Sequence, residues 1–185
     1  MKRNLLGAIL ALALVAPIAG AQSLNPIKFG VAGGITLPQG DLGDDEEGAG
    51  MGSGYNLQGM IGFQAPMVPV GLRVDVMYNS LKNDDADVDY TNFSGTLNGI
   101  FNLGMAPMVS PYLIGGVGMY NQKFAAGDED ISKTSFGLNG GVGVRFSLSG
   151  FSTFAEARYH HVMSEDEEEG WGNAQFVPIS FGIMF

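Results

Sequence analysis

AQFVPISFGIMF, residues 174–185, carries apolar side chains at every second position: Val177, Ile179, Phe181, Ile183 and Phe185. Apolar residues with a period of two over this length are typical of a β-strand that has one apolar face. The same period recurs in the chain before this segment. The whole sequence therefore predicts one small barrel of strands.

Seven earlier segments show the same alternation of apolar and polar residues. They cover residues 28–37, 55–64, 70–81, 90–103, 111–123, 134–148 and 151–163. In the glycine-rich segment 111–123, we place Tyr112, Ile114 and Tyr120 on the apolar face. Segments of this length match the strands of about 9–11 residues that cross a membrane at a tilt. We therefore predict an all-β fold: an eight-stranded antiparallel up-and-down transmembrane β-barrel.

The connections between these segments alternate between short uncharged turns and longer acidic loops. Of the 19 acidic residues, 17 fall in the four long loops, and only Asp75 and Glu156 fall in predicted strands. Alternate connections of an up-and-down barrel emerge at the same end. One end is therefore expected to be strongly anionic. Because outer-membrane barrels have short periplasmic turns and longer extracellular loops, we place the acidic loops outside the cell.

The polar faces of the predicted strands indicate which side of the barrel meets water. A soluble barrel with an apolar ligand cavity would expose its polar face, which would then be rich in Lys and Glu. Here the polar faces are mostly Gly, Ser, Thr, Asn and Gln, with a few charges of both signs: Arg73, Asp75, Arg145, Glu156 and Arg158. Buried charges must be paired. We therefore expect the apolar face to contact lipid and these five residues to form a polar network in a narrow lumen, as a structural plug or as a gate.

Aromatic residues are predicted to form two belts at the membrane surfaces, as in other membrane barrels. Near the acidic loops these are Tyr55, Tyr78, Tyr90, Tyr120 and Tyr159. Near the short turns they are Phe63, Phe101, Phe146 and Phe185.

The first residues predict a cleaved secretory signal peptide. Lys2 and Arg3 precede an apolar run over residues 5–16, and the small residues Ala19 and Ala21 mark a cleavage site. The run is shorter than the ~20 residues that a membrane-spanning helix needs, although an uncleaved anchor is the alternative. We expect residues 1–21 to be the signal peptide and residues 22–185 to be the barrel domain. That domain has seven basic and 19 acidic residues, a net charge of −12, which excludes nucleic-acid binding.

Several of these features resemble a known family. The leader, the strand rhythm, Pro111-Tyr112, Glu156-Ala157-Arg158-Tyr159 and the final Phe185 are similar to those of the small OmpA/OmpX-type barrels in the porin-family outer-membrane proteins of Gram-negative bacteria. The resemblance implies a place in the outer membrane, in contact with lipid and lipopolysaccharide. It also implies recognition by the barrel assembly machinery through the last strand, with Ile179, Phe181, Ile183 and Phe185 as the assembly signal.

For function, we expect a structural or interaction role through the acidic loops, with an external partner that the sequence does not identify. A narrow channel for water, ions or very small solutes is the alternative. A lipid-A-modifying enzyme is disfavoured, because His160 lies four residues from Ser164, about 13 Å along a strand, and His161 has the opposite parity. No cofactor or catalytic residue is expected.

A metal site is not expected either. Asp85, Asp87 and Asp89 have a spacing reminiscent of a calcium-binding loop, but Thr96 stands where a bidentate Glu would be needed. These aspartates are therefore interpreted as a solvated charge run.

Overall fold

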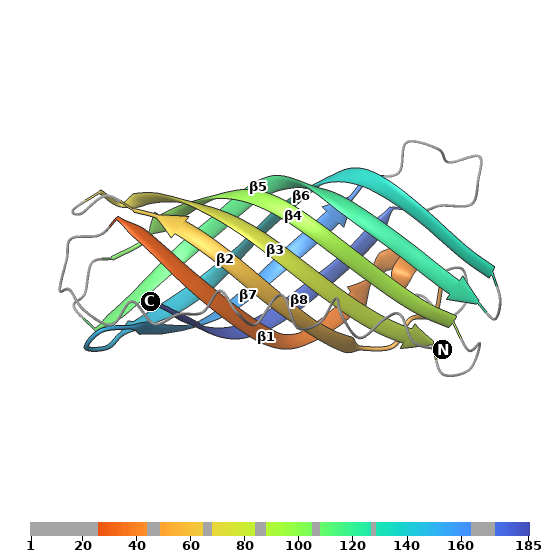
Figure 1. The fold of residues 1–185 in the computed structure, drawn as a ribbon, viewed down its shortest axis with the longest axis horizontal. Coiled ribbons are helices and arrows are strands. Elements are labelled where there is room, and N and C mark those ends of the chain that lie inside the picture. The colour runs from red at the N-terminus through yellow and green to blue at the C-terminus, as the bar shows by residue number, and fades with distance from the viewer. Residues whose placement is uncertain are drawn as a thin grey trace, which may run out of the picture.

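Eight strands in a computed structural model pair in sequence order to form a closed barrel (Figure 1). The structure describes residues 26–43, 49–64, 68–83, 88–104, 108–126, 129–163 and 173–185. The strands are β1 (Ile27–Gln39), β2 (Gly54–Phe63), β3 (Val70–Asn83), β4 (Val88–Asn102), β5 (Val109–Ala126), β6 (Glu129–Ser147), β7 (Ser152–Val162) and β8 (Ala174–Met184). All neighbouring pairs are antiparallel, which confirms the predicted eight-stranded up-and-down barrel.

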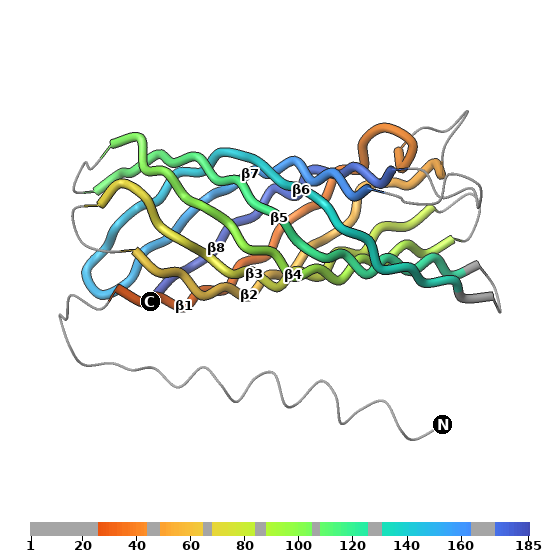
Figure 2. The backbone as a smooth tube through the Cα atoms, turned by 90° about the horizontal axis from the view of Figure 1, so that it is seen from above, coloured from red at the N-terminus to blue at the C-terminus, as the bar shows by residue number. Residues whose placement is uncertain are grey.

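Pairing of the first strand with the last one closes the sheet. The β1–β8 register runs from Gly30 opposite Met184 to Gln39 opposite Gln175. The strands run obliquely to the long axis, and the C-terminus lies at the end where β2–β3, β4–β5 and β6–β7 connect (Figure 2). We call this end the short-turn end and the opposite end the acidic-loop end. Closure pairs the first strand with the last, which removes the open sheet edge that a membrane does not tolerate.

Along the barrel wall, side chains alternate between the outside and the inside of the barrel. The outward face is apolar, with 50–65% exposure at Phe29, Leu57, Val74, Leu97, Val142 and Phe181. The interior holds many buried polar side chains, among them Asn56, Asn79, Asn92, Thr96 and Ser180. Within the described residues, no helix is long and apolar enough to cross a membrane.

The predicted orientation of β5 is wrong. Tyr112, Ile114 and Tyr120 are at most 4% exposed and point into the barrel, whereas Leu113 and Met119 face outward. The barrel interior supplies a hydrogen-bond partner for the hydroxyl group of each of the two tyrosines. The Tyr112 hydroxyl is 2.7 Å from a carboxylate, and the Tyr120 hydroxyl is 2.9 Å from an imidazole nitrogen. A buried hydroxyl is stable when it finds such a partner.

The predicted tyrosine belt is also wrong in part. Tyr90 and Tyr120 are fully buried in the interior and do not belong to it. Tyr55 and Tyr78 lie side by side on the outward face with their ring centroids 6.2 Å apart, and Tyr159 is also exposed. At the short-turn end, the outward phenylalanines are exposed: Phe63, Phe101, Phe146 and Phe185.

β5 and β6 are longer than predicted and project at the acidic-loop end (Figure 1). β6 pairs with β5 from Glu129 onward, but it pairs with β7 only from Gly137 onward. Consequently Asp89, Glu129 and Asp130, which were expected in loops, belong to strands. The projecting part of β6 therefore has one edge with which no described strand pairs.

The outward face changes from apolar to polar as the strands enter this projection. Phe93, Met119 and Phe136 are its last large apolar residues on β4, β5 and β6, and the next outward positions are Thr91, Asn121 and Thr134. Asn121 donates a hydrogen bond to Thr134 at 2.9 Å across the strands. This change marks the level at which the outward surface stops being suited to lipid.

Candidate functional site in the barrel lumen

Four charged side chains meet inside the barrel. Arg73 and Asp75 come from β3, and Glu156 and Arg158 come from β7, four strands away around the wall. Because residues i and i+2 share one face of a strand, both pairs point inward at the same level. Arg73 contacts Asp75 at 2.8 Å and Glu156 at 2.7 Å. Arg158 contacts the same two carboxylates at 2.8 and 2.9 Å.

We call Arg73, Asp75, Glu156 and Arg158 the ion-pair quartet. Each guanidinium touches both carboxylates, so the quartet is a neutral cycle in which every charge has two opposite neighbours. All four residues are at most 3% exposed. Removing charges from water costs about several kcal/mol per ion, and close pairing with opposite charges of this kind offsets that cost. The quartet thus fixes β3 and β7 across the lumen.

Neutral groups complete the coordination of the two carboxylates. The Tyr112 hydroxyl donates to Glu156 at 2.7 Å, and the Asn98 amide donates to Asp75 at 3.0 Å. Two glycines of β6 make room for this packing. A Cβ at Gly143 would overlap the Tyr112 ring, and one at Gly141 would lie 2.8 Å from Cγ of Arg158.

Arg145, the fifth residue of the predicted lumen network, lies outside the quartet. Its guanidinium stacks over the Tyr112 ring with 5.3 Å between the Cζ atom and the ring centroid. Its Nη1 donates to the Gln64 side-chain oxygen at 3.4 Å. Among the described residues, Arg145 makes no ion pair with a carboxylate. The structure therefore brings together four of the five predicted residues.

Sequence reasoning missed Tyr112 and Asn98 as members of this site. Asn98 lies on the polar face that the alternation of segment 90–103 predicts, but it is one of several similar amides on that face. Tyr112 was assigned to the wrong face, although Leu113, Val117 and Met119 supply a competing outward period in the same strand. A tyrosine opposite a glycine is the signal that could have indicated the inward orientation of Tyr112. Tyr112 pairs with Gly143 and fills the space left by the missing side chain of this glycine.

A layer of neutral hydrogen bonds lies beyond the quartet toward the acidic-loop end. Thr36 donates to Asn79 at 2.8 Å, Asn56 donates to Thr36 at 3.3 Å, and Ser180 donates to Asn56 at 2.9 Å. These residues come from β1, β2, β3 and β8, so the layer joins strands on both sides of the barrel closure.

An apolar plug occupies the lumen at the acidic-loop end. We use this term for the buried cluster formed by Leu42, Met51, Leu81, Tyr90, Tyr120, Val162, Ala174 and Phe176. Leu42 belongs to a 3-10 helix, η1 (Gly40–Leu42), which follows β1. His160 lies under the plug, stacked on Phe176 with 5.0 Å between ring centroids.

The residues weighed for catalysis and metal binding are dispersed. His160 contacts Tyr120, whereas His161 is half-buried on the opposite face of β7, and Ser164 is outside the described residues. Asp89 pairs with Lys82 at 3.1 Å on the surface, and Asp85 and Asp87 are outside the described residues. No group of three metal-ligating side chains occurs in the part of the chain that the structure describes.

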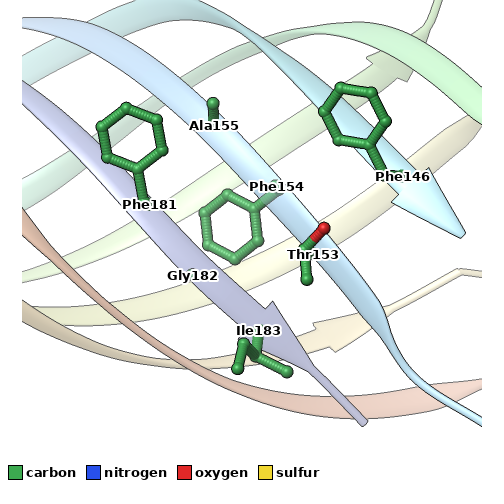
Figure 3. Close-up of a pocket in the computed structure, with 7 residues that line it drawn as sticks. All are labelled: Phe146, Thr153, Phe154, Ala155, Phe181, Gly182 and Ile183. Carbon is green, nitrogen blue, oxygen red and sulfur yellow. The ribbon is translucent and has the colours of Figure 1, made fainter. Parts of the chain in front are cut away.

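An apolar groove lies on the wall formed by β6, β7 and β8 near the short-turn end (Figure 3). Small residues at Thr153, Ala155 and Gly182 form its floor between Phe146 and Phe181. Phe146 and Phe181 are exposed on the outward face, so this groove does not open into the quartet. Its chemistry is that of the surrounding apolar surface.

Comparison with known proteins places the chain among membrane barrels. Residues 8–185 match the model of a family described as "Outer membrane protein beta-barrel domain". No curated protein sequence matches the chain.

Solved structures share the fold at low sequence identity. Neisserial surface protein A is 20% identical with a TM-score of 0.67, over 86% of this chain and 96% of its own. The N-terminal barrel of Pseudomonas aeruginosa OprF is 13% identical with a TM-score of 0.56, over 89% and 100%. Ail, the attachment invasion locus protein of Yersinia pestis, is 18% identical with a TM-score of 0.52, over 85% and 98%. These likenesses show the architecture alone.

Proposed function

Because the chain belongs to the outer membrane protein β-barrel domain family, we propose that it is an integral outer-membrane protein whose closed barrel carries an interaction surface at its acidic-loop end. The observation that carries this proposal is the contrast between a filled lumen and a projecting sheet. The ion-pair quartet and the apolar plug occupy the lumen at two levels. β5 and β6 meanwhile extend past their neighbour β7.

The filled lumen favours this scaffold role over conduction, which is the alternative. An ion crossing the barrel would have to separate the quartet, whose contacts are 2.7–2.9 Å long. It would then have to pass the apolar plug, where Tyr90, Leu81 and Phe176 are fully buried. A water-filled path needs a polar, open interior such as that of larger barrels.

The projecting edge of β6 is the part of the surface best suited to a partner. Met163 N donates to Phe136 O, so even-numbered residues of β6 direct their backbone groups toward β7. Ser132 and Thr134 lie beyond the last paired residue of β7. An edge of this kind accepts an extended segment as an additional strand. The acidic loops around it would attract cationic segments and repel anionic ones.

Two further roles rest on the outward surface. The apolar wall would contact outer-membrane lipid, with the acidic loops meeting lipopolysaccharide through bridging divalent cations. The last strand would serve as the assembly signal, because Phe181 and Phe185 are 65% and 58% exposed on its outward face.

The signal peptide, with Ala19 and Ala21, lies outside the described residues and stays a prediction.

Fractionation and bilayer recordings test the scaffold role. The protein should appear in the outer-membrane fraction and should migrate differently on SDS gels before and after boiling, because a closed barrel resists detergent. Planar bilayers that contain it should show no stepwise conductance. Steady conductance steps from the pure protein would favour the channel instead.

The edge surface needs its own measurement. The probe is a fluorescent peptide of alternating Lys and Val, which is cationic and forms strands readily. It should bind cells that display the protein, and Thr134→Pro should weaken this binding because proline removes an edge donor and blocks strand addition. Asn121→Ser, on the outward face of the neighbouring strand β5, is the matched control. A proline at Thr91 would be a poorer control, because Thr91 lies on β4 between two paired strands. Equal binding by wild type and Thr134→Pro would contradict the edge surface.

A further inference from the structure

Two cations at the short-turn end of the lumen have no carboxylate partner among the described residues. Arg145 on β6 is half-buried, and Lys28 on β1 is exposed at the rim. Both have the inward parity of their strands. Arg145 Nη1 donates to the Gln64 side chain, and the backbone N–H of Gln64 donates to Pro26 O, two residues before Lys28, so both cations lie at the same mouth. In a chain with so few basic residues, two unpaired cations at one mouth require an explanation.

The other positive charges of the barrel interior are neutralised within it. Arg73 and Arg158 belong to the quartet. Glu156 is the nearest carboxylate to this mouth on β7, but Arg73, Arg158 and the Tyr112 hydroxyl already bind it. The Tyr112 ring, on which Arg145 stacks, is thus bonded to the quartet. The short turns themselves contain no acidic residue.

Unsatisfied hydrogen-bond donors lie at the same mouth. Nε of Arg145 and Oγ of Ser152 are buried and have no hydrogen-bond partner among the described residues. Ser152 is only 3% exposed and faces inward at the start of β7. Ser147, opposite Ser152 on β6, is two residues from Arg145. A partly buried cation without a counter-charge is unfavourable, so such a place selects an anion.

We propose that the short-turn mouth of the lumen binds a phosphate group, with Arg145 as the principal ligand and Lys28 as the second charge. A guanidinium presents a planar fork that matches two phosphate oxygens, and its position over the Tyr112 ring holds the Arg145 side chain at this mouth. Lys28 adds a mobile point charge at the rim. The phosphate comes either from a phospholipid headgroup at the adjacent membrane surface or from free phosphate in solution.

The test uses the full barrel in zwitterionic detergent and two probes. Isothermal titration measures the binding of inorganic phosphate at constant ionic strength, and native mass spectrometry measures the retention of phosphatidylglycerol against phosphatidylcholine. Arg145→Gln and Lys28→Gln are compared with Lys82→Gln, which removes one positive charge at the opposite end. Arg145→Lys keeps the positive charge but removes the planar guanidinium, so it separates the contribution of the charge to phosphate binding from that of the guanidinium geometry. The boiled-versus-unboiled gel shift establishes that each variant is folded.

We expect Arg145→Gln to weaken binding by about tenfold or more, the scale of one lost hydrogen bond to a charged group. Lys28→Gln should weaken it less, and Lys82→Gln should leave it unchanged. Binding of phosphatidylglycerol identifies the headgroup as the source, and binding of inorganic phosphate alone identifies free phosphate. If neither probe binds the wild type more tightly than folded Arg145→Gln, or if Lys82→Gln weakens binding equally, the proposed site is wrong.

Discussion

Arg73 and Glu156 are 83 residues apart in the sequence, yet Nη2 of Arg73 and Oε1 of Glu156 are 2.7 Å apart in the lumen. The pair joins β3 to β7 across the barrel, and Asp75 and Arg158 close it into a neutral cycle. We therefore expect that removing one charge leaves the remaining charges buried without enough opposite charge, which destabilises the barrel.

Glu156→Gln should destabilise the barrel by about 3–5 kcal/mol, because two buried guanidiniums then share a single carboxylate. Urea unfolding in lipid vesicles, followed by the gel shift on boiling, measures the free energy. Asp89→Asn is the matched control, since it breaks an ion pair whose side chains are more than half exposed. Such surface pairs contribute little. Equal effects of the two substitutions would mean that the quartet does not stabilise the fold.

Gly143→Ala should destabilise the barrel by about 1–3 kcal/mol through overpacking. The new methyl group would overlap the Tyr112 ring, which cannot move away without breaking the hydrogen bond to Glu156. Gly140→Ala in the same strand is the control, because its Cβ would meet only Ile114 O at 3.9 Å. The same urea titration compares the two variants, and an unaffected Gly143→Ala would show that the lumen is loosely packed.

The sequence was sufficient to predict the architecture because each strand obeys a period of two. Val70–Asn83, for example, alternates Leu72, Val74 and Val76 with Arg73 and Asp75, and the structure places these on opposite faces of the wall. Local patterning carries this information, since side-chain direction in a strand depends on parity alone.

The interior of β5 could not be predicted in the same way. Both faces of this strand carry apolar residues, and glycines at positions 115, 116 and 118 remove the contrast between them. Which face of β5 points inward depends on hydrogen-bond partners from a distant strand, Glu156 for Tyr112 and His160 for Tyr120. Likewise, the separation of Arg145 from the quartet depends on the Tyr112 ring, which parity alone did not place inside.

The cost of an arginine on the outward face should depend on its depth in the membrane. Val142→Arg, at a position between Phe136 and Phe146, should cost about 2–4 kcal/mol, whereas Thr134→Arg should cost about 0–1 kcal/mol because it lies above the apolar surface. Both residues are exposed on the same face of β6. Unfolding in vesicles compares them. A similar cost at both positions would place the membrane boundary elsewhere than between Phe136 and Thr134.

Phe176→Ala tests whether the lumen has two independent closures. Phe176 is fully buried, stacks on His160, and meets the Tyr120 ring edge-on at 6.5 Å between centroids. Its truncation leaves a cavity in the plug and should cost about 3–5 kcal/mol in the free energy of unfolding. Conductance should nevertheless stay at the baseline, because the quartet still fills the barrel below the plug. The combination of Phe176→Ala with Glu156→Gln should conduct more than either single variant. Conductance of Phe176→Ala alone would mean that the plug is the only barrier and that the quartet holds the strands without sealing the lumen.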